Sequence, residues 1–186
     1  MDTYIDVTVD DLMALAERAE QIASRNATES LGITKVMSQP VRTVQASTSL
    51  AEAAHLMVTE RVSGLPVVDD SGHLVGIITE ADFLRALGVP AHQPHHSLWQ
   101  TLESLFSHLA RHGEIDAPDD QIADHMVRDV VCASPDQDLH HVIELMKRHK
   151  VKRVVVCDDE RRVLGIVTRS DLVRIFFDRY TQQSRR

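Results

Sequence analysis

The sequence has little that would support several large classes of function. Its 186 residues include only two cysteines, Cys132 and Cys157, without CxxC spacing. This favours two buried, unreactive thiols in a reducing compartment over a disulfide or a metal site. No apolar run exceeds a few residues, so no segment is expected to span a bilayer. Residues 1–6 are acidic and lack the profile of a secretion signal. We therefore expect a cytoplasmic protein.

Basic charge and catalytic motifs are also scarce. Twenty lysines and arginines against 28 acidic residues give a net charge of −8, which disfavours nucleic-acid binding. There is no GxGxxG, P-loop, paired catalytic carboxylate motif or Ser/His/Asp signature, so we do not expect an enzyme. His108 and His112 lie at i,i+4 spacing in a histidine-rich stretch over residues 92–112. Without cysteine or a placed carboxylate, solvated loop histidines are favoured over a metal site.

What the chain does contain is an internal repeat. When the sequence is shifted by 89 residues, residues 34–87 (the first repeat) match residues 123–176 (the second repeat) at 14 of 54 positions without a gap. Composition alone would give about three matches. The densest match is the pattern G-I-x-T-x-x-D, found at residues 76–82 and 165–171. The chain is therefore a duplication.

Each repeat predicts the same order of elements, β-α-β-β-α. A short strand (41–44 and 130–133) leads to a helix capped by Ser49 or Asp138, and two β-branched runs joined by a hairpin turn follow. A last helix begins at Thr79 or Thr168. One repeat cannot cover its own apolar sheet face, so we expect an α/β (α+β) fold of two repeats packed with pseudo-twofold symmetry. A ligand cleft is expected between them.

Two further helices are predicted outside the repeats. Helical spacing of apolar residues is found over residues 8–27 and again over 97–112. The first helix either packs on the repeats or forms a dimer or partner contact. The predicted organisation is a helical extension (1–32), a first domain (33–88), a helical linker (89–121), a second domain (122–180) and a tail (181–186).

The repeated motifs resemble a tandem pair of CBS domains, also called a Bateman module. The resemblance is carried by V-S-G-L-P-V-V-D at 62–69 and V-K-R-V-V-V at 151–156, each followed by the G-I-x-T-x-x-D pattern. The layout is also similar to the cytosolic CBS pair of HPP-family membrane proteins. The resemblance implies a regulatory module, not an enzyme, with no required cofactor and with AMP, ADP or ATP as ligand. It also implies that the aspartate of each motif holds the ribose diol, while nearby hydroxyl and basic side chains meet phosphate.

The T-x-x-D spacing has a chemical rationale of its own. Each threonine stands where a strand ends and a helix starts, and each aspartate follows in the first helical turn, where it can accept two hydrogen bonds from a diol. A simple capping box is the alternative, and the two roles are compatible. Gly76 and Gly165 mark either a packing contact or a ligand approach. The candidate nucleotide-binding residues are Ser63, Thr79, Asp82, Lys152, Arg153, Thr168, Ser170 and Asp171.

The residues that would contact phosphate differ between the repeats. The second repeat has a basic run at 148–153 and a hydroxyl at Ser170, where the first has Ala81. We therefore predict inequivalent clefts, with most of the phosphate-binding charge in the second repeat.

The favoured function is a nucleotide sensor that modulates a dimer or a partner. The alternative is an assembly scaffold without a physiological nucleotide. The expected partners are a second copy of the chain and an unidentified target, which could be a membrane protein, but not a nucleic acid.

Overall fold

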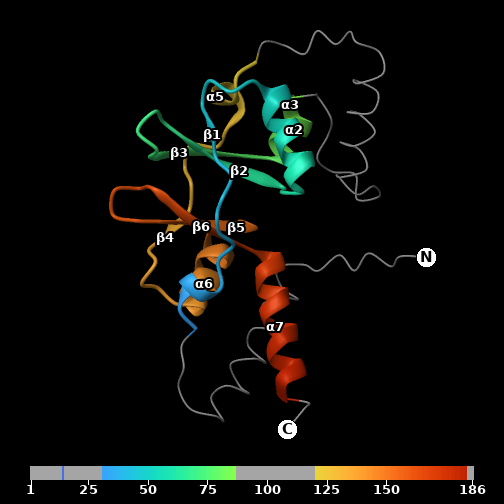
Figure 1. Ribbon diagram of the computed structural model, residues 1–186, viewed down its shortest axis with the longest axis vertical. Coiled ribbons are helices and arrows are strands. Elements are labelled where there is room, and N and C mark those ends of the chain that lie inside the picture. Colours follow the sequence, from blue (N-terminus) through green and yellow to red (C-terminus); the bar gives the residue numbers. More distant parts are fainter. Residues whose placement is uncertain (1–13, 15–30, 87–119, 184–186) are drawn as a thin grey trace, which may run out of the picture. The chain divides into compact units, whose positions relative to one another are not determined.

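The structure, a computed structural model, describes residues 31–86 and 120–183 together with the isolated residue Ala14 (Figure 1). The described part of residues 42–130 forms one compact unit, the first-repeat unit. The described parts of residues 1–41 and 131–186 form another, the second-repeat unit. The predicted helices at 8–27 and 97–112, and the histidine-rich stretch, lie outside the described residues.

The first-repeat unit contains a three-stranded sheet with helices. In chain order it consists of β1 (Val44–Gln45), α2 (Leu50–Glu60), β2 (Gly64–Val68), β3 (Leu74–Thr79), α3 (Glu80–Ala86) and α5 (Ile122–His125). Strand β1 pairs in parallel with β2, and β2 pairs antiparallel with β3. The predicted β-α-β-β-α order is confirmed here.

The second-repeat unit has the same topology. Its elements are the short helix η1 (Ile33–Lys35), β4 (Cys132–Ala133), α6 (Leu139–His149), β5 (Arg153–Cys157), β6 (Val163–Thr168) and α7 (Arg169–Gln183). The sheet order is β4-β5-β6, with a parallel and then an antiparallel pair. Strands β1 and β4 contain two residues each, so the sequence overestimated their length.

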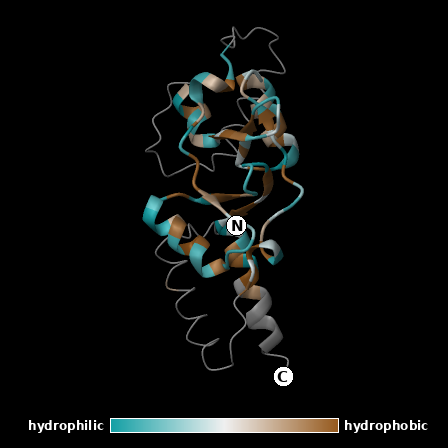
Figure 2. Ribbon diagram, turned by 90° about the vertical axis from the view of Figure 1, so that its left-hand side faces the viewer, coloured by the Kyte–Doolittle hydropathy of each residue, from teal (hydrophilic) through white to brown (hydrophobic). Residues whose placement is uncertain are grey.

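The helices begin where the sequence predicts. The Ser49 hydroxyl accepts a hydrogen bond from the Glu52 backbone N–H at 3.2 Å, and the Asp138 carboxylate accepts one from the His141 N–H at 2.9 Å. Apolar residues of each helix face the sheet of its own unit, and the strands are largely hydrophobic (Figure 2). The mixed α+β fold is thereby confirmed.

The segment that precedes the first strand of each repeat, residues 31–41 or 120–130, packs on the sheet of the other repeat and is called the exchanged segment below. Ser38 pairs with Ile166 of β6 through N–H···O contacts of 2.9 and 3.2 Å. Val127 pairs in the same way with Ile77 of β3, with both contacts at 2.9 Å. Ile33, completely buried, belongs to the core of the second-repeat unit. The compact units therefore do not begin where the duplicated sequence begins.

Two glycines make this exchange possible. A Cβ on Gly165 would overlap the Met37 sulfur and lie 3.0 Å from the Met37 Cβ. A Cβ on Gly76 would lie 2.5 Å from the Met126 sulfur. Both glycines are buried within strands. Of the two alternatives left open by the sequence, the structure gives these glycines a packing role, because each admits a methionine of the exchanged segment.

Gly165→Ala is therefore expected to lower the free energy of unfolding by about 1–3 kcal/mol, as overpacking of a filled core does. Relief would require Met37 to move at its Cβ and not merely at its flexible end. Urea denaturation followed by circular dichroism measures the effect. The control is Gly32→Ala, whose new methyl would meet only the Thr34 hydroxyl, at 4.0 Å. Equal stability of the two variants would contradict this packing role.

Candidate functional site

The T-x-x-D element of the first repeat joins the end of β3 to the start of α3. The Asp82 Oδ2 atom accepts hydrogen bonds from the Thr79 backbone N–H at 2.7 Å and from the Thr79 hydroxyl at 2.6 Å. Its Oδ1 atom accepts one from the Arg85 guanidinium at 2.6 Å. Asp82 is 1% exposed. One half of the predicted capping box is therefore present, in which the Asp82 carboxylate accepts from the Thr79 N–H, and these contacts orient the carboxylate.

The second repeat reproduces this arrangement between β6 and α7. The Asp171 Oδ2 atom accepts from the Thr168 N–H at 2.9 Å and from the Thr168 hydroxyl at 2.7 Å. The Oδ1 atom accepts from Arg174 at 2.9 Å and, in addition, from the Ser38 hydroxyl at 2.9 Å. Asp171 is 5% exposed.

The two carboxylates differ in what they can still bind. A carboxylate offers about four acceptor positions. Asp171 uses four of them in the contacts above, whereas Asp82 uses three. The difference arises at one position of the exchanged segment, where the second-repeat unit has Ser38 and the first-repeat unit has Val127. With respect to the described residues, 31–86 and 120–183, Asp82 therefore has one acceptor position left at Oδ1.

The other predicted residues lie beside these elements. The Ser63 carbonyl accepts from the Glu80 N–H at 3.4 Å, and the Lys152 carbonyl accepts from the Arg169 N–H at 3.3 Å. Arg153 is paired with Thr168 across β5 and β6. The side chains of Ser63, Lys152 and Ser170 are exposed. Ser63, Thr79 and Asp82 thus come together in the first-repeat unit, and Lys152, Arg153, Thr168, Ser170 and Asp171 come together in the second.

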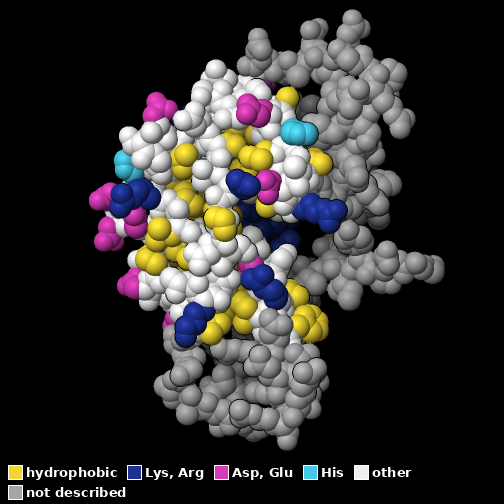
Figure 3. Space-filling model, viewed as in Figure 1, with side chains coloured by type: hydrophobic (Ala, Val, Ile, Leu, Met, Phe, Trp, Pro, Cys, Tyr) yellow, Lys and Arg dark blue, Asp and Glu magenta, His cyan; other side chains and the backbone are white. Residues whose placement is uncertain are grey.

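Sequence reasoning missed three residues of this site. Arg85 and Arg174 each bind the aspartate three residues before them, and Ser38 binds Asp171. The arginines could have been found, because they are among the identities between the repeats. The Arg85 side chain is 62% exposed and the Arg174 side chain is 58% exposed. Figure 3 shows Lys and Arg side chains on one face of the molecule, in dark blue. Ser38 has no such signal, because it is far from Asp171 in sequence and unmatched in the other repeat.

Two kinds of site find no support among the described residues. Over residues 31–86 and 120–183, no group of three or more histidine, cysteine, aspartate or glutamate residues is arranged to hold a metal ion. Within the same ranges, no helix is both long and apolar enough to cross a bilayer.

Comparison with known protein families gives one match on each of the two repeats. The family model described as the CBS domain matches residues 33–89 and 122–178. The chain is 32% identical to L-aspartate semialdehyde sulfurtransferase of Methanocaldococcus jannaschii over 141 residues. This match covers 76% of the chain but only 22% of the relative's length.

Two solved structures with bound ligands share the fold. One is a CBS domain pair in complex with 5′-methylthioadenosine and S-adenosyl-L-methionine, at 30% identity and a TM-score of 0.63, covering 81% of this chain and 99% of that one. The other is CBSX2, known from Arabidopsis thaliana, in complex with AMP. It has 26% identity and a TM-score of 0.58, covering 84% of this chain and 99% of that one.

Proposed function

The chain belongs to the CBS-domain family, and on that premise we propose that it is a regulatory module that binds an adenine nucleotide (AMP, ADP or ATP) through its T-x-x-D elements. The observation that carries the proposal is the same buried, oriented carboxylate at the same strand–helix junction in both repeats. The ligands of the two similar structures, AMP on one hand and 5′-methylthioadenosine and S-adenosyl-L-methionine on the other, all contain adenosine with a ribose diol. A diol donates two hydrogen bonds, which suits a carboxylate.

Asp82 is the better candidate for the ribose. The Arg85 guanidinium covers Oδ1, but this side chain is 62% exposed. Moving it aside breaks an ion pair whose carboxylate is buried, so the hydroxyls of the ligand must replace the hydrogen bond that Arg85 gives up. Access to Asp171 requires Arg174 and Ser38 to move, and Ser38 is held by its backbone pairing with Ile166. The Asp82 carboxylate therefore has fewer hydrogen bonds to give up before it can receive a diol.

The second repeat is the better candidate for phosphate. Lys152 and Ser170 are exposed beside its T-x-x-D element, and Arg153 faces Thr168 across the strand pair. At the corresponding positions the first repeat has Ser63, Gly64 and Ala81, which carry no charge. The predicted inequivalence of the two repeats, with most of the phosphate-binding charge in the second, is thus part of the proposal.

Regulation would follow from linkage. A ligand that binds one conformation or one assembly state more tightly shifts the population toward that state, and it strengthens any partner with the same preference. The chain spans 22% of the length of the sulfurtransferase relative, so a role beside a separate catalytic or membrane domain is part of this proposal. Four properties stay predictions: a homodimer, a cytoplasmic location, a relationship to HPP-family proteins and the lack of enzymatic activity.

Calorimetric titration with AMP, ADP, ATP, NAD and S-adenosylmethionine tests the proposal. At least one adenylate is expected to bind in the micromolar range, about −8 kcal/mol. The same ligand should raise the melting temperature of the chain, because it binds only the folded state. Absence of binding by all five ligands to a folded chain would contradict the proposal and favour the assembly scaffold.

A further inference from the structure

The two T-x-x-D elements differ in the number of acceptor positions that a ligand can obtain from them. A vicinal diol donates two hydrogen bonds, so it needs two acceptor positions on the carboxylate that holds it. Among the described residues, Asp82 accepts two hydrogen bonds from Thr79 and one from Arg85. Because the Arg85 side chain is largely exposed, it can turn toward solvent, which leaves two acceptor positions at Oδ1. Asp82 therefore meets the requirement of a diol.

Asp171 does not meet this requirement, although its other contacts are the same. It accepts two hydrogen bonds from Thr168, one from Arg174 and one from the Ser38 hydroxyl. The Arg174 side chain is also largely exposed, and its movement would leave one acceptor position. Ser38 cannot follow it as easily, because its backbone N–H and C=O are both bonded to Ile166. Asp171 can thus accept only one of the two hydroxyls of a diol while Ser38 stays in place.

Val127 takes the position of Ser38 in the first-repeat unit. Ser38 forms an antiparallel bridge with Ile166, and Val127 forms the same bridge with Ile77. The residues of one bridge are offset by 89 positions from those of the other, which is the offset of the duplication. A valine side chain has no group that could donate to a carboxylate. In the part of the chain that the structure describes, the hydroxyl at this one position therefore accounts for the difference between the two carboxylates.

We propose that each chain binds the ribose diol of one nucleotide only, at Asp82, and that Ser38 closes the second carboxylate to a diol. This inference rests on the proposed function and adds to it the number of diol sites and the residue that sets this number. Ser38 takes the place of a ribose hydroxyl at Asp171 and joins the exchanged segment 31–41 to that carboxylate. The second T-x-x-D element therefore has a structural role, while the exposed Lys152 beside it can still meet phosphate.

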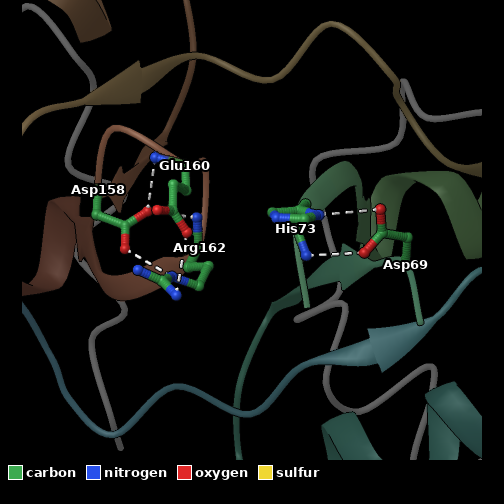
Figure 4. Close-up of polar contacts among 5 residues, drawn as sticks. All are labelled: Asp69, His73, Asp158, Glu160 and Arg162. Carbon is green, nitrogen blue, oxygen red and sulfur yellow. Dashed lines mark hydrogen bonds and ion pairs between the residues drawn. The ribbon is translucent and has the colours of Figure 1, made fainter. Parts of the chain in front are cut away.

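Another pair of equivalent aspartates has different partners in the two repeats and supplies a control. In the turn between β2 and β3, Asp69 accepts from the His73 backbone N–H at 2.9 Å and pairs with the His73 imidazole at 3.4 Å. In the turn between β5 and β6, Asp158 accepts from the Arg162 backbone N–H and guanidinium, both at 2.8 Å (Figure 4). These turns lie at the opposite ends of β3 and β6 from the T-x-x-D elements. An exchange of residues between the turns should therefore leave diol binding unchanged.

Calorimetric titration of the full chain with AMP, ADP and ATP, and with the 2′,3′-dideoxy analogue of the tightest of them, counts the diol sites. A bound equivalent is diol-dependent if the analogue binds there roughly tenfold more weakly. The wild type is expected to show one such equivalent per chain. Ser38→Val should show two, because it gives Asp171 the same partners that Asp82 has. Ser38→Thr, which is isosteric with Ser38→Val but keeps a hydroxyl, should show one.

The reciprocal substitution tests the first repeat and leaves the contacts of Ser38 intact. Val127→Thr adds a hydroxyl at the position next to Asp82 without a change of side-chain shape, and it should weaken diol-dependent binding roughly tenfold. Val127→Ala removes methyl groups without adding a hydroxyl, and it should keep the diol-dependent equivalent. His73→Arg, which gives the first repeat the turn residue of the second, is the control and should show one equivalent, as the wild type does.

The inference is overturned if the wild type shows two diol-dependent equivalents, if Ser38→Val shows no second one, or if Ser38→Thr gains a second one as well. It is also overturned if Val127→Thr binds the diol as tightly as Val127→Ala. Failure of the proposed function gives a different result, because no adenylate would then bind to the folded wild type, and the inference would fall with it.

Discussion

An Asp82→Ala variant is expected to bind the preferred adenine nucleotide roughly 5- to 150-fold more weakly than the wild type, the equivalent of about 1–3 kcal/mol for lost hydrogen bonds to a charged group. The reason is the acceptor position that Asp82 keeps at Oδ1 beneath an exposed Arg85. Asp171→Ala is expected to weaken binding less, by about threefold or below. The carboxylate of Asp171 is already committed to four hydrogen bonds.

Calorimetric titration of the two variants measures this difference. Both substitutions remove a helix-capping interaction, so the control is Asp138→Ala, which removes the cap of α6 and changes no residue of either T-x-x-D element. This control should bind as the wild type does. A larger loss of affinity in Asp171→Ala than in Asp82→Ala would show that the acceptor count does not decide where the ribose binds.

For the free energy of unfolding we expect the opposite order, with a larger loss in Asp171→Ala than in Asp82→Ala. Asp171→Ala should lower the free energy of unfolding by about 2–4 kcal/mol, since it leaves the Thr168 N–H and the Ser38 hydroxyl without their acceptor. The substitution also loosens the exchanged segment, because Arg174, which binds Asp171, donates to the Val36 carbonyl at 3.5 Å. In the part of the chain that the structure describes, Asp82 has no hydrogen bond to an exchanged segment, so for Asp82→Ala we expect a loss of about 1–3 kcal/mol.

Urea denaturation gives both values, and Ser38→Ala separates the contributions. Alone, Ser38→Ala should cost about 1 kcal/mol, the net value of one hydrogen bond. Combined with Asp171→Ala it should cost almost nothing further, since its acceptor is already gone. Two results would show that the contact between Ser38 and Asp171 does not hold the exchanged segment in place. One is that the losses of unfolding free energy in Ser38→Ala and Asp171→Ala simply add in the double variant, and the other is that Asp171→Ala is as stable as the wild type.

Much of the fold could be predicted because it is encoded locally. The capping residues Ser49 and Asp138, the β-branched runs and the two T-x-x-D elements each specify structure within a few positions, and duplication provides an internal check. The orientation of Asp82 and Asp171 toward their threonines follows from the same spacing. Arg85 and Arg174 could have been added, because they are identical between the repeats and lie one helical turn further on.

What could not be predicted depends on contacts between distant segments. Met37 and Met126 are recognisable as equivalent, but nothing in their neighbourhood shows that each packs on the sheet of the other repeat. The contact of Ser38 with Asp171 spans 133 positions. Cys132 and Cys157 come to lie in neighbouring strands because β4 and β5 adopt one parallel register, and strand register follows from packing as a whole.

We propose above that the Asp82 carboxylate receives the ribose diol of an adenine nucleotide. This contact can be measured by a double-mutant cycle, with AMP and its 2′,3′-dideoxy analogue titrated into the wild type and Asp82→Ala. Removal of the two hydroxyls is expected to weaken binding to the wild type roughly tenfold and binding to Asp82→Ala hardly at all. An equal loss in both proteins would place the diol elsewhere and contradict the claim.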